Sequence, residues 1–345
     1  MNVNKEINNN DISVVVQGPI VGSKNDKYED RHTFICLKSI RKYLPGATII
    51  LSTWKGSDVE GLDYDILVEN QDPGTTIVGN FSSNCLRQVV SSINGLKKCN
   101  TKYAIKMRTD LVLKGNEFIS YFIKYNQLQF DQNYKILKQR VVTLTTCNPS
   151  RKFRFPFSVS DWFFFGLTED VKNIFDISLI NKSVTKKDEN DNERINDTFY
   201  QPEQHIWVSF LSKYKQISLR HTTDASNDNI VMSEKYLANN CVLLTARQVG
   251  IDWQKYPGAA YAQIPCLSNT GLYTFNEYKK ILNKYANNNL LIIPNILEEI
   301  VYFIVYNLRF FVKKKNPKLH DFICRLVNRR NHERVKERST KTNVK

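Results

Sequence analysis

Strand-like and helix-like patterns alternate over residues 12–113, and this alternation constrains the fold more than any other feature of the sequence. Four short apolar or β-branched runs, each closed by turn residues, have the pattern of buried strands. They occupy residues 12–16, 47–53, 64–68 and 103–113. Helix patterns lie between them, at 34–44 and after Asn80, which is a candidate helix cap. This alternation predicts an α/β fold of Rossmann type, with a mixed, mostly parallel sheet and helices on both faces.

The middle of the chain predicts two more strands and one more helix. Strand-like runs lie at 141–146 and 159–166, and the polar residues 181–198 predict a surface loop. Pro202 stands where the first residue of a helix would, with Glu203 behind it and an apolar face after it.

The C-terminal region differs in composition, so we expect a folded domain at 1–285 and an extension at 286–345. Of the 23 residues from 290 to 312, 17 are apolar or tyrosine, and residues 313–345 carry twelve Lys or Arg against three acids. An amphipathic helix followed by a basic tail fits an anionic membrane surface. A helix packed on the domain, followed by a solvated tail, explains the same pattern equally well.

The distribution of charged residues and cysteines bears on the class of partner and on the cellular compartment. The formal net charge of +15 is concentrated in the tail, which leaves the body mildly basic. A nucleic-acid-binding protein would spread basic residues and exposed aromatics over its body, so we rank that function low and expect no nucleic-acid partner. Seven cysteines without a CxxC pair, and a start without an apolar leader, predict a cytoplasmic protein.

Polar segments follow several of the predicted strands. They are Gln17-Gly18-Pro19, Asp72-Pro73-Gly74 and Arg108-Thr109-Asp110. Because ligands of such sheets bind beyond the carboxyl ends of the strands, we expect these segments to be neighbours. Lys106, Arg108 and Asp110 alternate onto one strand face, where they can bind a pyrophosphate while Asp110 holds a divalent metal. The alternative is an internal Arg108–Asp110 ion pair that serves only stability.

The helix predicted after Asn80 presents Asn84, Arg87, Gln88 and Ser91 opposite its apolar face. Amide side chains are unusual on a merely solvated helix face, where Lys and Glu are commoner, so these groups can reach a ligand. The alternative is an ordinary polar surface helix.

Three further positions are candidates for contact with a second substrate. Asp161 and Trp162 can hold a sugar, with the indole stacking on C–H groups and the carboxylate accepting hydroxyl protons, or they can be a strand-end cap and a core residue. Glu203 lies at a helix N-terminus, where the helix dipole keeps a general base ionised. His205 and His221 are lone histidines, which are most often structural.

Several common catalytic motifs are absent from the sequence. It contains no GxxxxGK[ST] loop, GxGxxG fingerprint, HExxH or GxSxG. Phosphate-loop ATPases, dinucleotide dehydrogenases, zincins and serine hydrolases are therefore poor interpretations.

A series of short segments occurs in a specific order along the chain. They are VVVQGPI at 14–20, SIRKYLPGATIILSTWKG at 39–56, NQDPG at 70–74, N-x-x-R-Q at 84–88, GLKK at 95–98, YAIKMRTDL at 103–111, SDWFFFG at 160–166 and PEQ at 202–204. Together they resemble the WavE lipopolysaccharide-synthesis family, densely over residues 13–113 and more thinly beyond.

The resemblance implies a glycosyltransferase with the single-domain, Rossmann-like fold called GT-A, and the domain at 1–285 is its expected extent. Such enzymes usually hold the donor pyrophosphate and a Mn²⁺ or Mg²⁺ ion with an Asp-x-Asp motif. Here Arg108-Thr109-Asp110 stands in that place, so Arg108 can neutralise the pyrophosphate directly and metal dependence stays open. The resemblance also maps the general base onto Glu203 and a histidine metal ligand onto His221.

We therefore expect a cytoplasmic glycosyltransferase, peripheral on the inner face of the plasma membrane. It would move a sugar from an activated donor, such as a nucleotide sugar, to a lipopolysaccharide or capsular polysaccharide, as a glycan or lipid-linked glycan acceptor. Glu203 or Asp161 would act as base and Trp162 would contact the acceptor. The expected donor-binding residues are Gln17, Gly18, Pro19, Asp72, Asn84, Arg87, Gln88, Lys106, Arg108 and Asp110. A ribosyl pyrophosphate or other sugar-phosphate donor on the same fold is the alternative.

Overall fold

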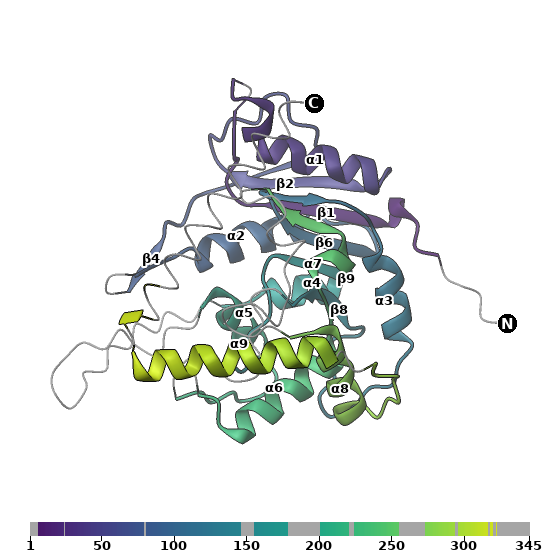
Figure 1. The fold of residues 1–345 in the computed structure, drawn as a ribbon. Helices are drawn as coiled ribbons and strands as arrows, with labels where there is room; N and C mark the ends of the chain where they lie inside the picture. Colours follow the sequence, from purple (N-terminus) through teal and green to yellow (C-terminus); the bar gives the residue numbers. More distant parts are fainter. Residues whose placement is uncertain are drawn as a thin grey trace.

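The computed structural model describes residues 6–23, 25–78, 81–145, 155–178, 201–220, 224–254, 273–293, 296–316, 318–319 and 322. Its centre is a seven-stranded sheet with the order β3-β2-β1-β6-β9-β8-β10 (Figure 1). The strands are β1 (Ile12–Gln17), β2 (Thr48–Trp54), β3 (Ile66–Asn70), β6 (Tyr103–Arg108), β8 (Val141–Leu144), β9 (Phe163–Leu167) and β10 (Cys241–Leu244).

The strand directions confirm the mixed, mostly parallel sheet. Strand β1 pairs in parallel with β2 and β6, β2 with β3, and β8 with β10. Strand β9 runs antiparallel to its neighbours β6 and β8. Because β3, β2, β1 and β6 share one direction, their carboxyl ends meet at one edge of the sheet.

The described helices are 3₁₀ helices η1 (Asn9–Asp11) and η2 (Tyr28–Asp30), followed by nine α-helical segments. These are α1 (His32–Tyr43), α2 (Cys85–Leu96), α3 (Phe118–Asn126), α4 (Thr168–Phe175), α5 (Pro202–Leu211), α6 (Asn227–Asn240), α7 (Ala246–Val249), α8 (Phe275–Tyr285) and α9 (Ile296–Lys315). Two short antiparallel pairs complete the described elements: β4 (Thr76–Val78) with β5 (Phe81–Ser83), and β7 (Leu111–Leu113) with β11 (Ile251–Trp253).

Helices cover both faces of the sheet, as the alternating pattern predicts. On β9, Phe164 contacts Phe175 of α4, whereas Phe163 and Phe165 contact Phe118 of α3. Neighbouring residues of a strand point to opposite faces, so α3 and α4 lie on opposite sides of the sheet. Every residue of β1 is buried, which places the core on both sides of the central strand.

Helix α2 approaches the sheet more closely than a side chain would allow at one position. A Cβ atom on Gly95 would collide with Cγ1 of Val15 and lie 3.1 Å from Cβ of Ser52. The helix therefore packs directly against β1 and β2, and its N-terminal turn lies toward the carboxyl ends of these strands.

The structure corrects three details of the predicted elements. Residues 103–113 do not form one strand, because β6 ends at Arg108 and the chain turns before β7. The turn is pulled toward β1, since the Thr109 amide donates to the Gln17 carbonyl at 3.1 Å and its hydroxyl to the Pro19 carbonyl at 2.8 Å.

The other two corrections concern element starts. Helix α2 has Asn84 at its N-cap and begins at Cys85, because Phe81–Ser83 forms β5; the predicted cap Asn80 lies outside the described residues. Strand β9 begins at Phe163, so Asp161 and Trp162 precede it. Residues 181–198, predicted as a loop, also lie outside the described residues. The division at 285/286 stays a prediction.

Candidate functional site

A cleft of about 390 Å³ opens at the carboxyl ends of the parallel strands. This volume falls within the range typical of small-molecule sites, about 300–1,000 Å³. Its lining comes from the ends of β1, β2 and β6, from the segment after β3 and from the first turn of α2. The lining residues are Gln17, Gly18, Pro19, Val21, Trp54, Asp72, Asn84, Arg87, Gln88, Arg108, Thr109 and Asp110. The three polar segments picked out in the sequence therefore meet around one cleft.

The turn after β1 forms one wall of the cleft. Gly18 has a φ of 122°, a conformation that side chains rarely adopt, and a Cβ atom there would lie 3.3 Å from the Thr109 hydroxyl. Gln17 is buried, and its Oε1 accepts a hydrogen bond from the Ser91 hydroxyl of α2 at 2.7 Å. The turn is thus fixed both to the end of β6 and to α2.

An arginine–aspartate pair lies at the end of β6. Arg108 donates to Asp110 through two nitrogens, Nε at 2.9 Å and Nη2 at 2.6 Å. Trp253 of β11 donates its indole N–H to the same carboxylate at 3.0 Å. Burial alone raises the pKa of Asp110, but hydrogen bonds from Arg108 and Trp253 outweigh it, so the pKa lies below its ordinary value and Asp110 is ionised.

Two indole rings support the Arg108 guanidinium. Its central carbon lies 5.4 Å from the centroid of the Trp162 ring, and the Trp162 and Trp253 rings are 5.1 Å apart. About a third of the Arg108 side chain stays exposed, against 12% for Asp110. The pair therefore presents the cation to the cleft and keeps the carboxylate behind it.

A second arginine–aspartate pair joins α2 to the segment after β3. Arg87 donates to Asp72 through Nε at 2.7 Å and Nη2 at 2.6 Å, and through Nη1 to Asn84 at 3.2 Å. The hydrogen bonds from Arg87 lower the pKa of Asp72, and the Gly74 amide adds to this effect. Both side chains are about one-third exposed, so an anionic ligand can compete for Arg87.

Gln88 carries a buried hydrogen-bonding atom that the described chain does not satisfy. Its Oε1 is shielded from solvent and has no hydrogen-bond partner in the structure. Such an orphaned polar atom is costly, and at a cleft it indicates a place where a ligand group completes the bonding. The side-chain amide can turn to offer either its oxygen or its nitrogen.

Lys106 does not line the cleft, contrary to its predicted grouping with Arg108 and Asp110. The side chain is fully buried, donates to the carbonyl of Asp161, and lies 5.1 Å from the Phe175 ring. Burial lowers the pKa of Lys106 to about 8, although the carboxylates of Asp161, Asp110 and Glu203 favour its charged form. Lys106 is therefore buried in the protein and is not part of the cleft lining.

Asp161 lies next to Lys106 and is itself buried. Its Oδ1 atom is buried and has no hydrogen-bond partner among the described residues. Glu203 follows Pro202, which begins α5 as the sequence predicts. Asp161 and Glu203 both act electrostatically on Lys106 and on Cys85, the residue after cleft-lining Asn84. Two carboxylates and an ammonium group thus gather beside the first turn of α2.

The described residues contain no group of three or more His, Cys, Asp or Glu side chains that could hold a metal ion. The two carboxylates of the cleft, Asp72 and Asp110, are each engaged by two arginine nitrogens. The predicted ligand His221 lies outside the described residues.

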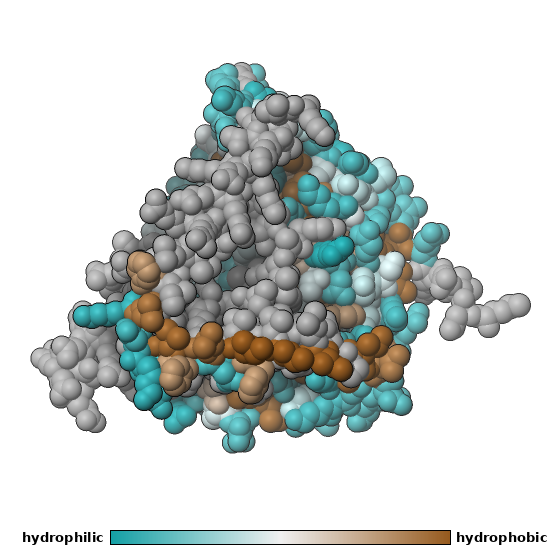
Figure 2. All heavy atoms as spheres, viewed as in Figure 1, coloured by the Kyte–Doolittle hydropathy of each residue, from teal (hydrophilic) through white to brown (hydrophobic). Residues whose placement is uncertain are grey.

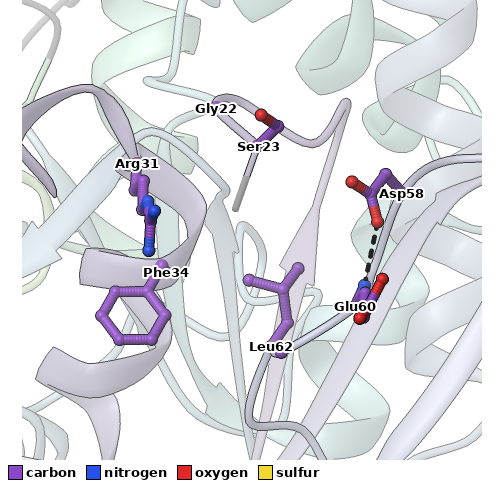
Figure 3. Close-up of a pocket in the computed structure, with 8 residues that line it drawn as sticks. Gly22, Ser23, Arg31, Phe34, Asp58, Glu60 and Leu62 are labelled. Carbon is purple, nitrogen blue, oxygen red and sulfur yellow. Dashed lines mark hydrogen bonds between the residues drawn. The ribbon is translucent and has the colours of Figure 1, made fainter. Parts of the chain in front are cut away.

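Figure 3 shows a second, smaller pocket between the loop after β1, α1 and the loop after β2. Arg31 and Phe34 lie on one side of it, and Asp58, Glu60 and Leu62 on the other (Figure 3). The Glu60 amide donates to Asp58 Oδ1 at 3.1 Å. The pocket holds about 80 Å³. This is well below the roughly 300 Å³ that small-molecule sites usually need, so the larger cleft is the candidate site.

The fold and cleft define an α/β protein with a polar, two-arginine site at the carboxyl ends of its parallel strands. Residues 12–301 match the model of a family described as WavE lipopolysaccharide synthesis. The chain belongs to the WavE family, and this confirms the resemblance seen in the sequence. No curated protein sequence matches the chain.

Three solved structures resemble the chain distantly. The 4-diphosphocytidyl-2C-methyl-D-erythritol synthase from Anaerococcus prevotii has 12% identity and a TM-score of 0.33, covering 66% of this chain and 97% of that one. The bifunctional IspDF from Campylobacter jejuni has 11% identity and a TM-score of 0.29, covering 50% and 45%. HddC from Yersinia pseudotuberculosis has 12% identity and a TM-score of 0.27, covering 47% and 78%. Because all three TM-scores are low, we draw no functional conclusion from them.

Sequence reasoning missed Val21 and Trp54, which line the cleft, and Trp253, which holds Asp110. Trp253 reaches Asp110 because β11 pairs with β7, a contact between segments 140 residues apart in the chain. No local motif marks it, since only the pairing of the two short strands brings the indole there.

Proposed function

We propose that the protein is a glycosyltransferase of the GT-A type, which moves a sugar from an activated donor to a lipopolysaccharide or capsular polysaccharide. One observation carries the proposal: two arginines and an unsatisfied glutamine line the same cleft at the strand ends. A nucleotide-sugar donor has a diphosphate that matches the arginines and hydroxyl groups that match the amides.

Arg87 and Arg108 hold the donor diphosphate in this proposal. Both are already oriented by aspartates, so little side-chain freedom is lost when the ligand binds. As the bond between the anomeric carbon and the diphosphate breaks, negative charge develops on the leaving oxygen. Fixed cations stabilise that charge as it develops. Gln17, Asn84 and Gln88 orient the rest of the donor.

Asp161 or Glu203 accepts the proton of the acceptor hydroxyl. The acceptor oxygen then bonds to the anomeric carbon while the diphosphate leaves, so each donor consumed yields one new glycosidic bond and one proton. Trp162, stacked beside Arg108, offers a ring face to the acceptor sugar. Lys106 holds the backbone of Asp161 and keeps the buried carboxylate in place.

Neutralisation by arginine is the form of leaving-group stabilisation that the described residues support. A Mn²⁺ or Mg²⁺ ion held by Asp110 would need to displace Arg108 or Trp253 from that carboxylate. We therefore assign no step to a metal.

The test is a transfer assay on the full chain with a panel of nucleotide sugars and sugar pyrophosphates, each with and without chelator. We expect one nucleotide sugar to be consumed, with chelator-resistant turnover. Consumption of a ribosyl pyrophosphate alone would favour the alternative donor, and no turnover or binding across the panel would contradict the proposal.

A matched pair of variants ties activity to the cleft. Arg87→Gln removes a cleft arginine paired with an aspartate, and we expect transfer to fall by about 10-fold to 100-fold. Arg41→Gln is the control, because Arg41 is also paired with aspartates, Asp63 and Asp65, but lies outside the cleft. An equal loss in both variants would count against a specific role for Arg87.

A further inference from the structure

Helix α9 displays a row of large apolar side chains to solvent. Six of them are between 49% and 69% exposed: Ile296, Ile300, Phe303, Ile304, Leu308 and Phe311. Figure 2 shows this row as an almost continuous brown band along the helix, with mainly teal residues below it. The exposed apolar side chains extend beyond the helix, to Leu291 and Ile293 before it and to Leu319 and Phe322 after it.

The six side chains occupy one face of the helix. At about 100° per residue, their positions fall within an arc of roughly 140°. A helix that exposes large apolar side chains along one face has the form of a surface-binding helix.

This face does not pack on the rest of the described protein. Large apolar groups that packed against the α/β domain would be buried, whereas these lose less than about half of their surface. Six large apolar side chains exposed along one helix of 20 residues, about 30 Å long, form a row of a kind that is rare on surfaces without a binding role. It therefore marks an interaction surface.

The charge next to the face identifies its partner. Lys314, Lys315 and Lys318 are exposed at the end of α9, and the sequence from 313 to 345 carries twelve basic residues against three acidic ones. A second copy of the chain would bring the same positive charge to the contact. An anionic lipid surface offers an apolar layer and negative head groups together.

We propose that α9 binds the surface of an anionic lipid bilayer, with its apolar face among the acyl chains and Lys314, Lys315 and Lys318 at the head groups. The helix lies flat in this arrangement. Among the described helices, none is long and apolar enough to cross a bilayer. The proposal concerns where the protein binds and does not depend on the reaction in the cleft.

The experiment is co-sedimentation of the full chain with vesicles of phosphatidylcholine alone or with phosphatidylglycerol added. We expect binding to the anionic vesicles only, weakening as salt is raised, because the electrostatic part is screened. Phe303→Ser/Leu308→Ser/Phe311→Ser should reduce the partition coefficient by about 100-fold, since three large apolar groups no longer enter the lipid.

Two controls separate lipid binding from other effects. Tyr28→Ser changes a side chain that is 53% exposed but lies on η2, and it should bind vesicles like the wild type. Thermal unfolding of the triple variant should match the wild type, since its altered positions are exposed. Light scattering gives the oligomeric state of both.

Three outcomes would overturn the proposal. The first is that the wild-type chain does not sediment with anionic vesicles, and the second is that the triple variant binds them as well as the wild type. The third is a dimer in solution that the triple variant dissociates while vesicle binding is unchanged, which would assign the face to a second copy.

Discussion

Two fully buried cations, Lys106 and Arg140, lie in different surroundings within the same protein. Arg140 donates to the carbonyls of Ala238, Tyr125, Leu128 and Gln129, and stacks 3.7 Å from the Phe130 ring centroid. Lys106 has one carbonyl acceptor, that of Asp161, and faces carboxylates near the cleft.

This difference in hydrogen-bond partners distinguishes a cation with a structural role from a cation near a functional site. Around Arg140, neutral carbonyl groups that already needed donors solvate the charge, so burial satisfies both sides. Around Lys106, the neighbouring Asp161 retains an unbonded oxygen, and the lysine pKa falls to about 8. Incomplete solvation of this kind is typical of functional sites.

The largest effect on stability is expected from replacing Arg140, the structural cation of this comparison. Arg140→Met removes the donor from several buried carbonyls, and we expect the free energy of unfolding to fall by about 3–5 kcal/mol. Urea denaturation measures it. Activity per folded molecule should stay near wild type, and a variant as stable as the wild type would contradict the structural role.

On the functional side, Arg108→Gln should lower transfer by about 100-fold or more, equivalent to ~3 kcal/mol of transition-state stabilisation. Arg108→Lys keeps the charge but loses the two-nitrogen contact, so its transfer rate should lie between that of the wild type and that of Arg108→Gln. The measurement is kcat/KM for the donor found in the panel. Wild-type kcat/KM in Arg108→Gln would remove Arg108 from the mechanism.

The buried lysine predicts a pH dependence of stability. The pKa of Lys106 is about 8 in the folded protein, against about 10.4 unfolded, so unfolded chains bind more protons between these values. Stability from this group therefore rises with pH over that interval, by up to ~3 kcal/mol. Below about pH 8 the group is protonated in both states and the gain is absent.

Lys106→Met should lack this rise, because the titrating group is gone. The check is the difference between wild type and variant in unfolding free energy, measured by urea denaturation across the interval. Parallel pH profiles would show that Lys106 is not desolvated as the structure indicates.

The smallest effect concerns the partly exposed pair at the cleft mouth. Asp72→Asn weakens the contact with Arg87, and we expect only a small change in the unfolding free energy, far below that of Arg140→Met, because exposed ion pairs contribute little. The change should shrink further in about 1 M salt, because screening acts on exposed charges. A loss as large as that of Arg140→Met would place Arg87–Asp72 on the structural side of the comparison.

Much of the N-terminal fold could be predicted because its signals are local. The runs that became β1, α1 and β2 carry their periodicity within a dozen residues, and turn residues close each one. The rule that parallel strands share a carboxyl edge then grouped residues 17–19, 72 and 108–110 around one cleft.

The remainder depends on contacts between distant segments. The apolar run at 103–113 contains no strand breaker, and only bonds from Thr109 to the turn after β1 divide it. Strand alternation places Lys106 on the same face as Arg108. It does not show that Lys106 is fully buried while Arg108 lines the cleft. Trp253 joins the site through the β7–β11 pair, which has no sequence signature.

Because Gly95 has no side chain, α2 packs close to the sheet at this position. Asn84, Arg87 and Gln88 lie toward the other end of the same helix, roughly 10–17 Å away along its axis at 1.5 Å per residue. A methyl group at Gly95 would push the C-terminal end of α2 away from the sheet. The helix would tilt, and the three side chains at its other end would move. The geometry of the cleft therefore depends on a residue that does not line it. A substitution at Gly95 should change the shape of the cleft without altering any of its lining residues.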